Sequence, residues 1–304
     1  MEKIILGTRG SALALAQVVL TRAALATAWP DLVVEEQIFV TRGDKKMDLS
    51  LLRAGEAGGK GLFTKELEDA LLAGTIDVAV HSLKDLPGQN PAGLALAAVL
   101  ERASTADVLI TKGIASLDAL PQGARIGTSS VRRSRQLQWL RPDLQIEEWR
   151  GNVPTRLRKL AERDDVAGIV LAKAGLDRLG CDFSDGKFTV ISLHEHLLPA
   201  IGQGAIALQT RADRAEVNAV LAAINHAPTF TCIRAEREVQ RLLAGDCALP
   251  VGVRSELHGD LLRLCGILFG PADQPPARAE ISGSADDPEL LAGQLFAQFA
   301  PPQS

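Results

Sequence analysis

Short apolar runs alternate with amphipathic segments along the first two thirds of the chain. In a first round, the runs with strand-like content are 3–8, 33–40 and 76–82. Helical spacing begins after Ser11 and after Thr64, and Pro30 ends the first of these helices near Ala28. In a second round, the strand-like runs are 106–111, 124–130, 145–149, 168–172 and 188–193. Between them, helices are expected at 131–140 and after Pro154. This alternation predicts two α/β lobes with parallel sheets covered by helices.

The pattern changes after residue 197. The segment "LPAIGQGAIALQT" (198–210) is a Gly-rich turn that leads into a strand. The elements expected beyond it are helices at 213–225 and 229–244, strands at 251–257, 261–269 and 277–283, and a final helix at 287–299. This order predicts a smaller C-terminal α+β domain with an antiparallel sheet. The fold class is therefore α/β, with two lobes followed by a smaller α+β domain.

A long irregular segment interrupts the first lobe. Residues 43–61 include five Gly and show little periodicity. A segment of this length inside an α/β lobe predicts a lid or a binding loop rather than an idle linker.

Composition narrows the class of protein. The 304 residues are 46% hydrophobic and 23% charged, which is typical of a globular protein. No apolar run reaches the length of a membrane helix, and the first residues read as a strand rather than a leader, so we expect a cytoplasmic protein. The four cysteines lack CxxC spacing and the "HEH" at 194–196 lacks further ligands, so neither a metal nor a disulfide framework is indicated.

Charge is distributed unevenly. The formal net charge of −4 argues against a general nucleic-acid binder. Between Arg125 and Arg178, however, there are ten Arg and two Lys against seven acidic residues. A basic island in an acidic chain indicates a local anionic ligand, with a solvated surface face as the alternative.

Three strand-to-helix turns carry arginine: "GTRGSALAL" (7–15), "GTSSVRR" (127–133) and "WRGNVPTRLRKL" (149–160). Free amides and the helix dipole favour an anion at each helix start. Arg132 and Arg133 would point about 100° apart on a helix. We therefore expect them to grip two carboxylates or one large ligand rather than share one group. The alternative is that Ser130 only caps the helix and the arginines are solvated.

The segment "VHSLKDLP" (80–87) places Lys84 and Asp85 at the end of a strand. A carboxylate at this edge of the sheet, among arginines, suits stabilisation of a cationic intermediate or proton transfer to a leaving amine. The alternative is a salt bridge with Lys84 or with an arginine.

Nine motifs occur in order over nearly the whole chain: "TRGSALAL", "TRGD", "GGKGLFTKELE", "DVAVHSLKDLP", "GTSSVRR", "RGNVPTRL", "LAKAGLDRLG", "PAIGQGA" and "GDCALPVG". Together they resemble the porphobilinogen deaminase (hydroxymethylbilane synthase) family. The resemblance implies two lobes like type II periplasmic binding proteins. Domain 1 would comprise residues 1–100 and 200–217, domain 2 residues 101–199, and domain 3 residues 218–304.

The resemblance also implies an activity. Four porphobilinogen units would be joined head to tail on a covalent dipyrromethane cofactor with loss of ammonia. Water would then release hydroxymethylbilane for porphyrin and haem biosynthesis, and the enzyme would be a monomer that uses neither nucleic acid nor membrane. The cofactor would form a thioether with Cys247, and Asp85 matches the catalytic aspartate.

Each pyrrole ring carries an acetate and a propionate, which would explain the arginines. The residues implied for the cofactor are Lys84, Thr128, Ser129, Ser130, Arg132 and Arg133. Those implied for the substrate are Arg9, Ser11, Lys60, Ser82, Arg150, Arg156 and Arg178. Two positions depart from the family pattern, Glu56 in the long loop and Asp246 beside Cys247.

Two other classes of protein compete with this interpretation. Two such lobes also make anion-binding proteins without chemistry, but Asp85, Cys247 and the lack of a leader count against that class. A nucleic-acid regulator is disfavoured by 4% aromatic residues, no Tyr and the negative net charge.

Overall fold

The computed structural model describes residues 1–41, 64–243, 250–271 and 274–299. The strands in these ranges are β1 (Lys3–Arg9), β2 (Val33–Phe39), β3 (Val78–Ser82), β4 (Leu94–Val99), β5 (Asp107–Thr111), β6 (Arg125–Gly127), β7 (Gln145–Glu147), β8 (Gly168–Ala172), β9 (Thr189–Ser192), β10 (Ile206–Arg211), β11 (Val251–His258), β12 (Leu261–Leu268) and β13 (Ala277–Ser284). The helices are α1 (Ala12–Ala28), α4 (Lys65–Leu72), α5 (Val131–Leu140), α6 (Val153–Glu162), α7 (Lys173–Arg178), α8 (Ala215–Ala222), α9 (Ala227–Leu242) and α10 (Pro288–Phe299), with a 3-10 turn η1 (Leu83–Asp85).

The first lobe is built on a sheet with the strand order β2-β1-β3-β10-β4. β1 is parallel to β2 and β3, whereas β10 is antiparallel to both β3 and β4. The prediction of a parallel sheet is therefore right for the first three strands and wrong for β10. The chain returns from the second lobe at the end of β3, where Ile206 pairs with Ser82, so the returning strand must run the opposite way.

Helices α1 and α8 contribute to one core of this sheet. Val18 and Leu25 of α1 pack with Ile4, Leu6 and Leu208 of the strands. Val217 and Leu221 of α8 join the same cluster. Helix α8 thus runs across the predicted boundary between residues 217 and 218 and packs on the first lobe.

The second lobe repeats this arrangement with the strand order β7-β6-β8-β5-β9. β6 is parallel to β7 and β8, whereas β5 is antiparallel to β8 and β9. One side of the sheet packs Leu109, Ile126 and Leu137, and the other packs Trp149 and Ile169. The predicted helices at 131–140 and after Pro154 are α5 and α6.

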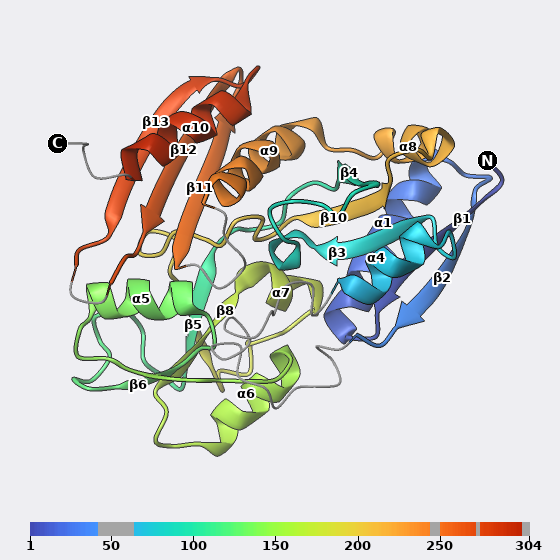
Figure 1. The fold of residues 1–304 in the computed structure, drawn as a ribbon. Helices are drawn as coiled ribbons and strands as arrows, with labels where there is room; N and C mark the ends of the chain where they lie inside the picture. Colours follow the sequence, from blue (N-terminus) through green and yellow to red (C-terminus); the bar gives the residue numbers. More distant parts are fainter. Residues whose placement is uncertain (42–63, 244–249, 272–273, 300–304) are drawn as a thin grey trace.

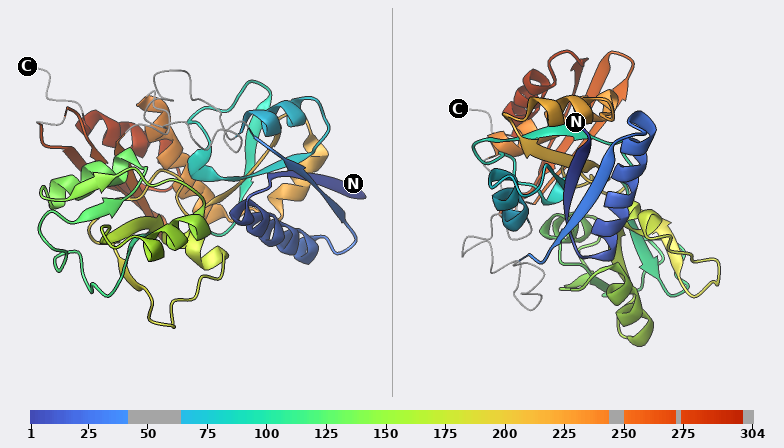
Figure 2. Two further views of the ribbon diagram at one scale, coloured as in Figure 1. Left: turned by 90° about the horizontal axis from the view of Figure 1, so that it is seen from below. Right: turned by 90° about the vertical axis from the view of Figure 1, so that its right-hand side faces the viewer.

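The C-terminal domain has a three-stranded antiparallel sheet, β11-β12-β13, with α9 and α10 packed on one face. Figures 1 and 2 show it lying against both lobes, with α9 between its sheet and the first lobe. The opposite face of the sheet carries charged side chains, including Arg254, Arg263, Arg278 and Glu280. The predicted fold class is confirmed: two α/β lobes are followed by a smaller α+β domain with an antiparallel sheet.

Two crossing segments join the lobes, residues 100–106 (the outgoing segment) and 198–205 (the returning segment). They are hydrogen-bonded to each other, since Ala103 N donates to Gly204 O. Arg102 Nε donates to Gln203 O at 2.9 Å, and its two terminal nitrogens bind the fully buried Glu236 of α9 at 2.6 and 2.9 Å. This buried ion pair ties both crossings to the C-terminal domain.

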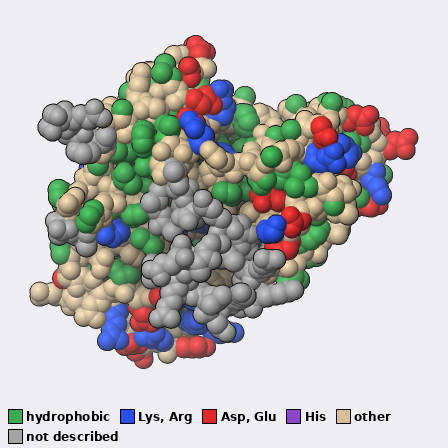
Figure 3. All heavy atoms as spheres, in the orientation of Figure 1, with side chains coloured by type: hydrophobic (Ala, Val, Ile, Leu, Met, Phe, Trp, Pro, Cys, Tyr) green, Lys and Arg blue, Asp and Glu red, His purple; other side chains and the backbone are tan. Residues whose placement is uncertain are grey.

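The surface carries mixed charge. On the face in Figure 3, lysines and arginines lie in small groups interspersed with acidic side chains. Among the described residues, no helix is long and apolar enough to cross a membrane, and no group of three or more potential ligand side chains could hold a metal ion.

Candidate active site

The carboxylate proposed for the chemistry lies where β3 leaves the centre of the first sheet. β3 ends at Ser82, and η1 then presents Lys84 and Asp85. Leu83 and Leu86 on either side are buried and anchor the turn. Ser82 Oγ accepts a hydrogen bond from Gln17 Nε2 at 2.7 Å, which links the turn to α1. Residues 82–86 are called the Asp85 turn below.

The returning segment packs directly against the Asp85 turn. Leu83 N donates to Ala205 O at 3.1 Å. Gly202 has φ +72°, and a Cβ at that position would lie 2.0 Å from Leu83 Cδ2 and 3.1 Å from Lys84 N. Both the backbone angle and the close approach require glycine there. The Gly-rich motif after residue 197 therefore shapes the backbone around Asp85.

Arg132 and Arg133, at the start of α5, are almost fully buried and converge on Asp107 at the start of β5. Arg132 Nη1 lies 2.7 Å from Asp107 Oδ2, and Arg133 Nη2 lies 2.7 Å from Asp107 Oδ1. Arg133 also donates to Val170 O, and Arg132 to Leu198 O. Gln203 Nε2 is a third side-chain partner of the Asp107 carboxylate, at 2.9 Å.

The expectation that two adjacent arginines would not share one group is wrong. The two side chains leave the helix in different directions, but both are long enough to bend toward Asp107. Each oxygen of its carboxylate then accepts hydrogen bonds from one of the two guanidiniums. Burial alone would raise the pKa of Asp107, and the two guanidiniums instead hold it well below the usual range of an aspartate. Each of the three guanidinium nitrogens of Arg133 donates within the chain.

Lys84 shares the electrostatic field of this cluster. Burial, followed by the charge of Arg133, lowers the pKa of Lys84 to about 8, although Asp85 and Asp107 offset part of the shift. Burial, Arg133 and Arg150 likewise lower the pKa of Arg156 to about 10. Part of each shift comes from repulsion between these cations, which an anion bound at the junction of the two lobes would relieve.

The hydroxyl groups of the "GTSSVRR" turn are engaged inside the protein. Thr128 Oγ1 accepts from Ser130 N, and Ser130 Oγ caps α5 by accepting from Arg133 N. Ser129 donates its hydroxyl hydrogen to Trp149 O at 2.6 Å. Because Ser129 has only that hydrogen, it cannot also donate to an anion in this arrangement. Ser11 caps α1 in the same way as Ser130 caps α5.

The remaining arginines surround this junction. Arg150 is paired with Glu148 at 2.6 Å, and Arg156 Nε donates to Gly151 O at 2.7 Å. Arg178 of α7 donates to Gly204 O of the returning segment, and its Nε is buried without a partner among the described residues. Arg9 lies close enough to His81 to add to the effect of burial, which lowers the pKa of His81 to about 4.

Part of the predicted site lies outside the described residues: Cys247, Lys60, the segment 43–61, Glu56 and Asp246. Within the described part, the structure couples Lys84, Asp85, Arg132, Arg133, Arg150 and Arg156 electrostatically.

Sequence reasoning missed the groups that hold this cluster in place. Asp107 opens a strand whose five residues are all buried, and an ionisable residue in such a strand is a signal for a paired charge. Arg102, Glu236 and Gln203 lie in segments that gave no comparable signal, because their partners are far away in the sequence.

The fold and site define a class of protein: a two-lobed α/β protein with a smaller C-terminal domain, whose cationic junction, beside a turn that carries a carboxylate, is suited to an acidic small molecule. The protein-family model described as "Porphobilinogen deaminase, dipyromethane cofactor binding domain" matches residues 4–219 of this chain. A second family model, "Porphobilinogen deaminase, C-terminal domain", matches residues 230–299. The chain belongs to the porphobilinogen deaminase family.

Individual relatives agree with this membership. The chain is 46% identical to a porphobilinogen deaminase from Syntrophomonas wolfei, with 93% of both chains covered. It is also 46% identical to one from Stenotrophomonas maltophilia, with 98% of this chain and 96% of the relative covered. Among solved structures, the periplasmic aliphatic sulphonate binding protein SsuA from Escherichia coli is 12% identical with a TM-score of 0.42, covering 80% of this chain and 71% of SsuA. A TM-score of this size carries no functional information.

Proposed function

We propose that this protein is a hydroxymethylbilane synthase, a transferase that condenses four porphobilinogen units with loss of ammonia and releases the linear product by hydrolysis. The observation that carries the proposal is that the buried Arg132 of α5 and the Asp85 turn contact the same returning segment, Arg132 by donating to Leu198 O and the turn by the hydrogen bond from Leu83 N to Ala205 O. Porphobilinogen is a pyrrole with two carboxylates and a primary amine. The site offers cations for the carboxylates and one carboxylate for the positive charge of the amine.

The residues present fit an acidic dipyrromethane. Arg132 Nε and Arg178 Nε are buried without hydrogen-bond partners among the described residues, and burial, followed by the charge of Arg133, lowers the pKa of Lys84. Lys84 and Arg132 would hold the cofactor carboxylates, with the charge of Arg133 and the hydroxyls of Thr128 and Ser130 beside them. When bound, through a thioether at Cys247, the cofactor supplies the pyrrole carbon from which the chain grows.

Each group of the chain has a distinct role in this proposal. Arg133 is committed to Asp107 and Val170, so it acts mainly through its charge and by ordering α5, whereas Arg132 retains a nitrogen without a partner. The Asp85 carboxylate would pair with the ammonium of the substrate and then stabilise the positive charge that develops on the pyrrole as the C–N bond breaks and ammonia leaves with the bonding electrons.

The other predicted groups would bind the substrate. Arg150, Arg156 and Arg178 surround the junction, and Arg9, Ser11 and Ser82 lie at the ends of β1 and β3. We assign Lys60 to the same set from its motif alone.

We further propose that domain 1 comprises residues 1–100 and 200–222, domain 2 residues 101–199, and domain 3 the remainder. The packing of α8 supports moving the first boundary from 217 to 222. We also propose that the enzyme is monomeric and works in the cytoplasm.

Intact mass under denaturing conditions tests cofactor attachment. The wild-type chain should carry the added mass of a dipyrromethane, and Cys247→Ala should lack it. Cys265→Ala is the matched control, since Cys265 lies on β12 and should leave the added mass in place. An unmodified wild-type chain that nevertheless turns over porphobilinogen would refute the attachment.

Ammonia release tests the role of Asp85. Asp85→Asn should keep its fold, as judged by circular dichroism, and lose about 100-fold or more in turnover, the range expected for a group that stabilises developing charge. Asp118→Asn is the control, because Asp118 is an exposed aspartate of the second lobe. Near-normal turnover in Asp85→Asn would show that another group does the chemistry.

A further inference from the structure

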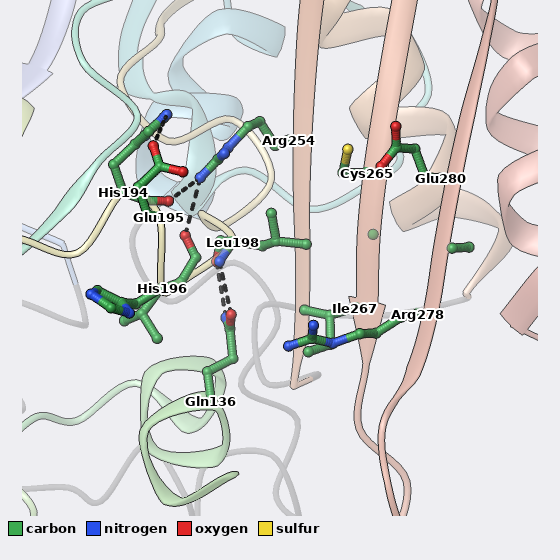
Figure 4. Close-up of a pocket in the computed structure, with 13 residues that line it drawn as sticks. Gln136, His194, Glu195, His196, Leu198, Arg254, Cys265, Ile267, Arg278 and Glu280 are labelled. Atoms are coloured by element: carbon green, nitrogen blue, oxygen red, sulfur yellow. Dashed lines mark hydrogen bonds and ion pairs between the residues drawn. The ribbon is translucent and has the colours of Figure 1, made fainter. Parts of the chain in front are cut away.

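A cavity of about 360 Å³ lies between the second lobe and the C-terminal domain, apart from the cationic junction around Asp85. Its floor is the face of β11–β13 opposite to α9 and α10. Its wall is the segment 194–198, which follows β9, together with Gln136 of α5 (Figure 4). We call it the interface cavity.

Two guanidiniums without carboxylate partners face this cavity. Arg254 donates to the backbone carbonyls of His194 and Leu197, and it forms no ion pair in the described part of the chain. Arg278 is exposed and has neither a hydrogen bond nor an ion pair with any described residue. In Figure 4 both side chains extend from the sheet toward the segment 194–198.

The carboxylates in the lining do not neutralise these arginines. Glu280 is paired with Arg263, which lies outside the lining, at 2.8 Å. Glu195 is 86% exposed, and its contact is with His194 at 4.0 Å. Burial raises the pKa of the Cys265 thiol, so the sulfur adds no negative charge. The lining holds two arginines and two glutamates, and the two arginines are the groups left without a carboxylate partner among the described residues.

The lining also has an apolar part that a bare inorganic ion would leave uncovered. Leu198 contributes partly exposed aliphatic surface beside the charged groups, and the almost fully buried Leu197 and Ile267 lie next to it in the lining. A volume of about 360 Å³ is at the lower end of small-molecule sites, which combine apolar walls with a few polar groups that fix orientation. Imidazoles of His194 and His196 add hydrogen-bond donors on the wall.

We propose that the interface cavity binds a compact organic dianion with a flat apolar body, such as an aromatic dicarboxylate. Its carboxylates pair with Arg278 and with the free side of Arg254, and its body lies on Ile267 and Leu198. Because Arg254 already reaches from β11 to the segment 194–198, a ligand here bridges the second lobe and the C-terminal domain. This site is separate from the one that would hold porphobilinogen.

Isothermal titration of the holoenzyme with phthalate tests the proposal, with Arg278→Gln as the decisive variant. Arg278 makes no contact that the fold needs, so this variant should fold normally and bind phthalate at least about tenfold more weakly. Arg234→Gln is the matched control, because Arg234 is an exposed arginine of the same domain, paired with Glu289 outside the cavity. No saturation at about 10 mM phthalate, or equal affinity in Arg278→Gln, overturns the proposal.

Two further measurements locate the ligand and define its class. Phthalate should slow the alkylation of Cys265, followed by peptide mass, because the thiol lines the cavity. Unchanged alkylation at saturating phthalate would place the ligand elsewhere and overturn the assignment. Inorganic phosphate should bind more weakly than phthalate, and equal affinities would refute the part of the proposal that requires an apolar body.

Discussion

Replacing Asp107 by Asn should remove more stability than any surface change of the same kind. The substitution keeps the size of the side chain but removes the carboxylate that pairs with both Arg132 and Arg133, whose side chains are 5% and 6% exposed. It also turns an amide N–H₂ toward a group of N–H donors. Within the described part of the chain, the two buried guanidiniums then lose the carboxylate with which both form ion pairs.

The magnitude follows from the two ion pairs. At about 4 Å and an effective dielectric constant of about 20, one such pair is worth about 4 kcal/mol before desolvation is counted. The carboxylate itself is costly to bury, so the two attractions do not add in full, and breaking a buried pair typically costs about 3–5 kcal/mol. With a urea m-value of roughly 3 kcal/mol/M, the unfolding midpoint of Asp107→Asn should fall by about 1–2 M.

Urea unfolding of the two proteins at neutral pH, followed by tryptophan fluorescence, is the assay. Asp213→Asn is the control, because Asp213 pairs with Arg211 at 2.6 Å but is 65% exposed, and such a pair is worth about 0–1 kcal/mol. Since the pKa of Asp107 is depressed in the fold, its contribution is complete above the unfolded value of about 3.9 and disappears as the pH falls below it. A midpoint for Asp107→Asn equal to that of Asp213→Asn would refute the reasoning.

Three other changes test other parts of the site. Gly202→Ala should lower the free energy of unfolding by about 2 kcal/mol or more, because its Cβ would overlap Leu83. Gly259→Ala is the control, since Gly259 has φ +58° but open space around it, and it should lower the free energy of unfolding by about 1 kcal/mol. Equal decreases, measured by urea unfolding, would contradict the crowding at Gly202. Burial lowers the pKa of Lys84 to about 8, so its ammonium loses its proton as the pH rises through 8. The difference in urea midpoint between the holoenzyme and Cys247→Ala, which measures stabilisation by the cofactor, should therefore fall there. Lys84→Arg should abolish that fall, and an identical pH profile in Lys84→Arg would contradict the assignment. Glu236→Gln should lower the free energy of unfolding by about 3 kcal/mol, because it removes the carboxylate that pairs with the buried Arg102. Glu289→Gln is the control, since Glu289 forms an exposed ion pair with Arg234, and it should change the free energy of unfolding by less than about 1 kcal/mol. Equal urea midpoints for the two variants would argue against a contribution of the buried pair.

Local patterns were sufficient for most elements of this fold, but strand direction was not a local property. The helix predicted at 131–140 is α5, with Ser130 as its cap, and the strand predicted at 168–172 is β8. The antiparallel placement of β5 and β10 was missed, because it depends on where the chain crosses between lobes and not on the residues of either strand. The strand β4 was also missed, since its alanines give little strand signal.

The site shows the same division. The position of Asp85 at the end of β3 followed from an apolar run that stops at a charged pair. The arrangement of Arg132 and Arg133 did not follow, because their common partner Asp107 lies 25 residues from Arg132 in the sequence. Helical spacing predicts the direction in which a side chain leaves the backbone. The partner toward which a long side chain bends, here Asp107, is known only from the fold.

The insertion of β10 between β3 and β4 has a consequence for how the chain folds during its translation. On the ribosome, β3 and β4 emerge more than a hundred residues before the strand that they share, so a nascent chain ending near residue 200 displays two unpaired strand edges. The sheet of the second lobe, in contrast, is formed entirely by residues 107–192 and is complete at that stage. We expect the second lobe to fold first and the N-terminal lobe to close only after release of residue 211, which leaves the earliest part of the chain to depend longest on chaperones.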